Sequence, residues 1–198
     1  MAFPRLLHAL PAAALFALGL AGGAAADTSA GASYVINLGG NIIATANFKL
    51  TDSNGSYQLA LNANVSGVAS LVAAGTAKAD SAGSVSAAGL QSNAFKLITH
   101  ASGQQFSVQV QYSGGNVSAF VIDPPIVNNI DRVPVERNQL SGVNDMLAAF
   151  LLRGPKLDRS LCDHHAQIFT GIERFDLDFR YAKDDVATSP RTGYQGPV

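Results

Sequence analysis

The sequence predicts a mainly β protein in which a curved antiparallel sheet forms a barrel or half-barrel, with one helix packed against the sheet or capping it. Three observations lead to this fold class. Residues 33–65 consist of three runs in which apolar residues alternate with polar or small residues. Turn signals separate these runs and recur as far as residue 122, and helical spacing is convincing only over residues 144–152. Because successive side chains on a strand point to opposite faces, the alternation predicts strands with one apolar and one polar face.

The first 26 residues have the features of a signal peptide. Arg5 supplies a positive charge, Leu6–Leu20 is an apolar run, and Ala24-Ala25-Ala26 is a small-residue cleavage site. An uncleaved membrane anchor is the weaker alternative, because Pro11 interrupts a run that is shorter than the ~20 residues a membrane span needs. We therefore expect a periplasmic protein in which residues 27–198 form a single antiparallel β domain, with no transmembrane span after cleavage.

The composition fits this assignment and disfavours nucleic acid as a partner. The 198 residues include 13 Lys and Arg against 14 Asp and Glu, so no strong field favours nucleic acid or an anionic membrane surface. Charged residues make up only 14% of the chain, while Gly, Ala, Ser and Asn are abundant. This balance is typical of an extracytoplasmic β protein whose polar face carries uncharged side chains.

The first three strands are expected within residues 33–65, with turns at Gly39-Gly40 and Asp52–Gly55. After them, Ser66–Ala74 is expected to form one or two helical turns. Gly75–Ala88 should form a weakly patterned strand, because small side chains specify register poorly. The residues that share the apolar faces of the first three strands are Tyr34, Ile36 and Leu38; Ile42, Ala44, Ala46, Phe48 and Leu50; and Tyr57, Leu59, Leu61, Ala63 and Val65.

A meander of three further strands is expected next. Ala94–His100 and Phe106–Tyr112 are joined by a turn at Ser102-Gly103, and Val117–Ile122 returns after a turn at Gly114-Gly115. The middle strand of this set has the cleanest alternation in the chain. The meander should therefore extend the antiparallel sheet.

The spacing of apolar residues predicts one helix over Asn144–Leu152. Asn144 or Asp145 would cap its N-terminus, and Gly154-Pro155 would end it. Its apolar stripe consists of Met146, Leu147, Phe150 and Leu151. Either this helix fills the concave side of the sheet, or part of that side stays open as a cavity.

The last unit with a clear pattern is a hairpin. Gln167–Phe169 leads through a turn at Thr170-Gly171 into Glu173–Tyr181, and the chain becomes polar and irregular from Ala182. The residues of the second strand that should face inward are Phe175, Leu177, Phe179 and Tyr181.

The continuous apolar face of the sheet indicates a binding function. We expect a non-catalytic periplasmic protein that binds an apolar ligand, such as a lipid or acyl chain, on a concave β surface and needs no cofactor. The alternative is a structural or interaction module in cell-envelope assembly, without a small-molecule ligand, in which Gly75–Ala88 is an edge strand available for pairing. The residues expected to face the ligand are Tyr34, Ile36, Phe48, Tyr57, Leu59, Leu61, Phe106, Val108, Val110, Phe175, Leu177 and Phe179.

Two groups of polar residues could in principle carry chemistry. Cys162–His165 resembles a set of metal ligands, but adjacent histidines on a strand point to opposite faces, so solvated loop histidines are the preferred interpretation. Asp176 and Asp178 could form an acid–base pair, but they share the polar face of their strand. The sequence therefore predicts neither a metal site nor a catalytic residue.

Cys162 is the only cysteine, and an oxidising compartment makes an unpaired thiol unusual. Three interpretations remain: a buried inert thiol, a half-disulfide whose partner lies outside this chain, or a reactive site. The chain ends at Gly196-Pro197-Val198, where a new strand would begin. This ending favours the half-disulfide and a domain that lacks its last strand.

Several short motifs occur in an order that matches a known family. They are Tyr34–Gly40 followed by Ile43–Ala46, then Gly55–Tyr57, Arg132–Val135, Asp145–Leu147 and Cys162–Leu177. With these motifs the chain resembles the family of exported bacterial proteins that carry the domain of unknown function 3108. The resemblance implies a barrel-like or half-barrel antiparallel fold similar to periplasmic lipoprotein carriers, and it brings no established activity and no catalytic residues. The family pattern has Asp where Thr170 stands here, and a second cysteine in a following strand.

Overall fold

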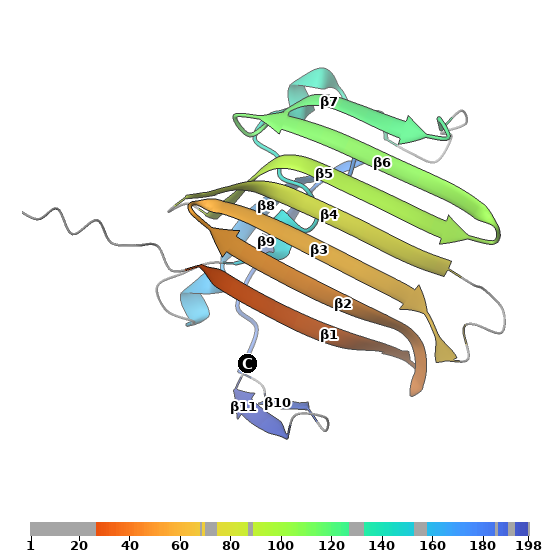
Figure 1. Cartoon of the computed structure of the whole chain (residues 1–198). Coiled ribbons are helices and arrows are strands. Elements are labelled where there is room, and N and C mark those ends of the chain that lie inside the picture. Colours follow the sequence, from red (N-terminus) through yellow and green to blue (C-terminus); the bar gives the residue numbers. More distant parts are fainter. Residues whose placement is uncertain are drawn as a thin grey trace, which may run out of the picture.

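The structure is a computed structural model that describes residues 27–67, 69, 75–86, 89–126, 133–152, 158–184, 186–189 and 193–197. Its largest part is a seven-stranded antiparallel sheet in which each strand pairs with its neighbours in sequence order (Figure 1). This arrangement confirms the predicted mainly β, antiparallel fold class. The strands are β1 (Thr28–Leu38), β2 (Asn41–Ser53), β3 (Ser56–Val65), β4 (Gly75–Ser86), β5 (Gly89–Ala101), β6 (Gln104–Ser113) and β7 (Asn116–Asp123).

Two hairpins and three short 3₁₀ turns follow the sheet. β8 (His164–Phe169) pairs with β9 (Arg174–Phe179), as the pattern of residues 167–181 predicted. β10 (Val186–Ser189) pairs with β11 (Tyr194–Pro197) in a region that was expected to be irregular. The 3₁₀ turns are η2 (Arg137–Leu140), η3 (Ala148–Phe150) and η4 (Arg159–Leu161).

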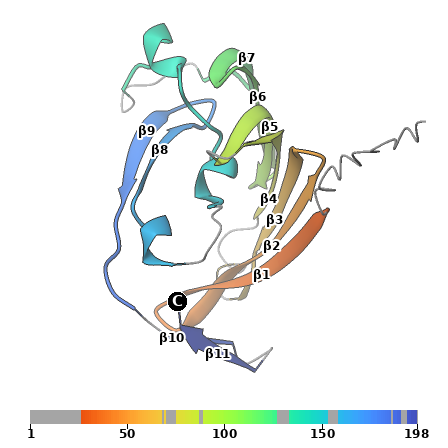
Figure 2. The ribbon, with the colours of Figure 1, turned by 90° about the vertical axis from the view of Figure 1, so that its left-hand side faces the viewer.

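The sheet is curved, but it does not close into a barrel, so that part of the prediction is wrong. Closure would require hydrogen bonds between the two edge strands. Here β1 and β7 lie at opposite edges, and the β8–β9 hairpin pairs with neither of them. Figure 2 shows the reason: the chain that follows β7 turns across the inner side of the sheet, and the β8–β9 hairpin stands on the far side of that chain.

The strand register separates the two faces of the sheet as the alternation predicted. One row of directly paired residues faces the core, and the adjacent row faces outward. The inner row contains Phe48, Leu61, Ala79, Leu97, Val108 and Ile122. The outer row contains Lys49, Ala60, Asp80, Lys96 and Gln109.

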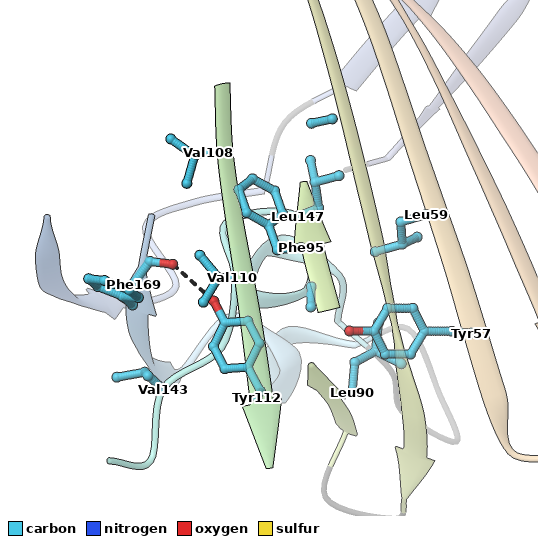
Figure 3. Packing of buried hydrophobic residues seen from close by; sticks show 12 residues of the cluster. Tyr57, Leu59, Leu90, Phe95, Val108, Val110, Tyr112, Val143, Leu147 and Phe169 are labelled. Carbon is cyan, nitrogen blue, oxygen red and sulfur yellow. Dashed lines mark hydrogen bonds between the residues drawn. The ribbon is translucent and has the colours of Figure 1, made fainter. Parts of the chain in front are cut away.

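The core forms where the inner face of the sheet meets residues 143–150, which we call the covering segment, and the end of β8 (Figure 3). Burial of each large apolar side chain in such a core contributes ~1.5–3 kcal/mol. The buried core residues of the sheet are Tyr57, Leu59, Ala79, Leu90, Phe95, Val108, Val110 and Tyr112, and those of the covering layer are Val143, Leu147, Ala148 and Phe169.

The helix predicted over Asn144–Leu152 is absent; the covering segment is irregular and contains only the single 3₁₀ turn η3. Asn144 pairs with β8 instead, since its N–H donates to the Gln167 carbonyl at 2.9 Å and its own carbonyl accepts from the Phe169 N–H at 3.0 Å. Leu151 is already extended, which leaves too few residues for a helix. The predicted stop at residues 154–155 lies outside the described residues.

Gly75–Ala88 is not an edge strand, so this part of the interaction hypothesis is wrong. β4 lies in the middle of the sheet and pairs with β3 on one side and β5 on the other. Its small inner residues make room for larger groups: a Cβ added at Gly83 would lie 2.7 Å from the Cε1 of the Tyr57 ring. Of the helical turns expected in Ser66–Ala74, most residues lie outside the described part of the chain.

Candidate functional site

The most concentrated polar group of the interior surrounds Asp145, whose side chain is completely buried. The hydroxyls of Ser81 and Ser92 each donate to its Oδ2 at 2.6 Å. Its Oδ1 accepts from the backbone N–H groups of Leu147 at 2.8 Å and Ala148 at 3.0 Å. The carboxylate therefore joins β4 and β5 to the covering segment, and buried donors occupy both of its oxygens.

Two further side chains extend this network. Because the Ser81 hydroxyl donates to Asp145, the Tyr57 hydroxyl at 3.2 Å donates to Ser81. Asn144 accepts from the Ser92 N–H at 3.0 Å and donates to the Leu90 carbonyl at 3.1 Å. Burial raises the pKa of Tyr57, and the nearby Asp145 charge adds to this effect while the Ser81 hydrogen bond opposes it. The network holds the covering segment in place.

A second feature is an apolar pocket with a volume of about 290 Å³ beside β7. It lies between the inner side of β7, the chain around η2 and the turn that joins β8 to β9. Phe120 and Phe169 meet edge to face there, with ring centroids 5.4 Å apart. Among the described residues, the lining carries no charged or hydrogen-bonding side chain and consists of Phe120, Ile122, Pro125, Ile126, Val135, Leu140, Phe169, Gly171 and Ile172.

The twelve residues predicted to face a ligand divide into three groups. Tyr57, Leu59, Val108 and Val110 are buried in the protein's own core. Tyr34 and Ile36 are 54% and 44% exposed near the end of β1. The partly buried ones are Phe48, Leu61 and Phe106 on the sheet and Phe175, Leu177 and Phe179 on β9.

None of these twelve residues lines the apolar pocket. Sequence reasoning missed its residues, although the alternation in Val117–Ile122 places Phe120 and Ile122 on one face. Apart from Phe169 at the end of β8, the rest of the described lining comes from η2 and irregular chain, for which no periodic signal exists.

The polar residues considered for chemistry lie apart from this pocket. Asp178 contacts His165 with an oxygen-to-nitrogen distance of 2.8 Å, and Asp176 contacts Arg174 at 2.6 Å. Each of these aspartates is thus engaged with its own basic neighbour on the exposed side of β9. Within the described part of the chain, no group of three or more His, Cys, Asp or Glu side chains could hold a metal ion.

Cys162 follows η4 and its side chain is exposed, so the interpretation as a buried inert thiol does not fit. The described residues include no helix that is both long and apolar enough to cross a membrane. Comparisons with protein-family models, curated proteins and solved structures gave no match.

Proposed function

We propose that the protein is a non-catalytic, periplasmic binding protein that holds an apolar ligand, such as a lipid or acyl chain, in the pocket beside β7. The observation that carries the proposal is that every described side chain that lines this pocket is apolar. Its volume lies at the lower end of the range for ligand pockets, which favours a single chain over a bulky ligand. Phe120, 47% exposed, provides an apolar entrance from solvent.

The energetics favour an unbranched hydrocarbon. Each methylene removed from water contributes ~0.8 kcal/mol, so several methylenes together can offset the cost of association. A headgroup would remain in solvent, because none of the described side chains of the lining can pair with it. The signal peptide predicted in residues 1–26 supports the periplasmic location.

Ile122 and Val121 provide a matched pair for testing this proposal. Ile122 lines the pocket, whereas Val121 lies on the other face of the same strand and is 61% exposed. Ile122→Asn should raise the Kd for dodecanoate about tenfold, because a polar group without a partner would be buried by the ligand. Val121→Asn should leave the Kd unchanged. Isothermal titration calorimetry of the purified mature protein measures both values, and circular dichroism checks the fold of each variant.

Native mass spectrometry of protein purified from the periplasm adds an independent measurement. A co-purified lipid that is lost in Ile122→Asn but kept in Val121→Asn would support the pocket. Equal binding by both variants, or no binding of dodecanoate by the wild type, would overturn the proposal.

A second candidate function, an interaction module, is favoured by the edge strand β1. Among the described strands, β1 pairs with β2 only, so its other edge is open. The strand contains no charged residue and no proline, the usual devices that protect an edge from pairing. Its exposed apolar residues include Tyr34, Val35 and Ile36. A second copy of this chain is the partner that fits, because antiparallel pairing of two uncharged β1 strands brings no like charges together.

Light scattering after size-exclusion chromatography tests this second candidate. The wild type should be a dimer, and Val35→Lys should shift it to a monomer because a charge on the edge opposes pairing. Asn62→Lys, which adds the same charge to the exposed face of the central strand β3, should remain a dimer. A wild type that is monomeric at high concentration would exclude self-pairing through β1.

A further inference from the structure

The outer face of the sheet contains a hollow with a volume of about 510 Å³, on the side away from the core. This face of β2–β6 is turned toward the viewer in Figure 1. Two adjacent rows of directly paired residues form the hollow, and each row crosses five strands. The rows are Lys49, Ala60, Asp80, Lys96 and Gln109, and Thr51, Gln58, Ala82, Ala94 and Gln111.

The charged side chains of this hollow are not neutralised by one another. Asp80 and Lys96 occupy directly opposite positions on β4 and β5. Even so, within the described ranges no ion pair or side-chain hydrogen bond joins the side chains of Lys49, Asp80 or Lys96 to another residue. Both ammonium groups and the carboxylate therefore keep their full capacity to bind a ligand.

We propose that this outer hollow binds an acidic oligosaccharide. Five strands at about 4.8 Å spacing give a groove roughly 19 Å long, which suits a short linear chain of sugars. The amides of Gln58, Gln109 and Gln111 each offer donors and an acceptor to sugar hydroxyls. The two lysines, three strands apart, can bind carboxylates at separate units of the ligand.

The floor of the groove supports the same ligand class. Ala60, Ala82 and Ala94 lie at its centre, so the flat C–H face of a sugar ring can approach the sheet closely. A peptide could not add to the sheet as a strand here, because β3, β4 and β5 are already paired on both sides. Nucleic acid fits less well, since no aromatic side chain among the described residues stands on the outer face of the groove for base stacking.

Lys96 and Lys78 give a matched pair for the test. Both lie on the outer face, but Lys78 stands one row away and does not line the hollow. A hyaluronan tetrasaccharide serves as the acidic probe, chitotetraose as the neutral one and hexaglutamate as an acidic peptide. Lys96→Gln should weaken binding of the hyaluronan tetrasaccharide at least tenfold, and Lys78→Gln should change it less than twofold, as measured by calorimetry on the mature protein.

Nuclear magnetic resonance locates the bound probe. Backbone amide shifts at Ala60, Ala82 and Ala94 on addition of the hyaluronan tetrasaccharide would support the site. The proposal would be overturned by absence of binding at millimolar concentration, by equal effects of the two lysine variants, or by equally tight binding of hexaglutamate. Ile122→Asn should leave saccharide binding unchanged, because Ile122 lies on the inner face. The experiments therefore test the outer hollow and the apolar pocket separately.

Discussion

Asp145→Ala is expected to lower the free energy of unfolding by about 4 kcal/mol, a large part of the total stability of an ordinary domain. The substitution leaves the buried hydroxyls of Ser81 and Ser92 without their acceptor. It also removes the acceptor of the Leu147 and Ala148 N–H groups, which start the turn of the covering segment. Equilibrium unfolding in urea, followed by far-ultraviolet circular dichroism, measures the change.

Three further variants make this expectation specific to the network. Asp80→Ala removes an exposed aspartate of the same sheet and should change stability by less than about 0.5 kcal/mol. Ser92→Ala removes one of the donors and should cost about 1–3 kcal/mol, which keeps the test informative if Asp145→Ala does not fold. Asp145→Asn should cost less than Asp145→Ala, because one oxygen remains for the backbone donors. Stability of Asp145→Ala within 1 kcal/mol of the wild type would contradict the assigned role.

The sheet could be predicted from the sequence because its signal is local. Alternation along each strand shows which residues share a face, and the glycine turns show that consecutive strands pair. The predicted glycine turns join β1 to β2, β2 to β3, β5 to β6 and β6 to β7, and each of these pairs is adjacent in the sheet. Val108 and Val110 are completely buried, as their position in the alternating run Phe106–Tyr112 required.

The covering segment could not be predicted in the same way, because its structure depends on residues far away in the sequence. Asn144 or Asp145 was expected to cap a helix that does not form, but Asp145 does accept the N–H groups of Leu147 and Ala148. Its other oxygen is bonded to Ser81 and Ser92, and nothing nearby in the sequence marks these two among the many serines. Because Asn144 pairs with β8, the chain cannot start a helix there. The spacing of apolar residues that predicted a helix is then also compatible with an irregular segment that packs on the sheet.

The candidate site shows the same division. Two of the nine described lining residues come from β7, where alternation places Phe120 and Ile122 on the inner face. The others come from the chain after β7, from η2 and from the end of β8 with the β8–β9 turn, which meet β7 only in the folded protein. Whether the sheet closes into a barrel could not be predicted either, because local patterns do not determine whether the two edges of a sheet meet.

Gly171 is the residue through which the β8–β9 turn approaches the sheet most closely. Its φ of +93° is unfavourable for any other residue, and an added Cβ would overlap the Cγ1 of Val108 and lie 3.2 Å from the Cγ2 of Val110. Gly171→Ala is therefore expected to lower the free energy of unfolding by about 3 kcal/mol, the sum of backbone strain and overpacking. Urea unfolding measures the loss.

Gly103→Ala separates the two contributions, since Gly103 also has a positive φ, +76°, but has no atom within 4 Å of an added Cβ. It should cost only the backbone strain, about 1 kcal/mol. Val108→Ala removes the methyl group that Gly171→Ala would meet, so the double variant should be at least 1 kcal/mol more stable than the sum of the two single effects predicts. If the changes in unfolding free energy caused by Gly171→Ala and Val108→Ala were additive, the β8–β9 turn would not pack against β6. Because Gly171 also lines the apolar pocket, loss of this contact should weaken dodecanoate binding as well.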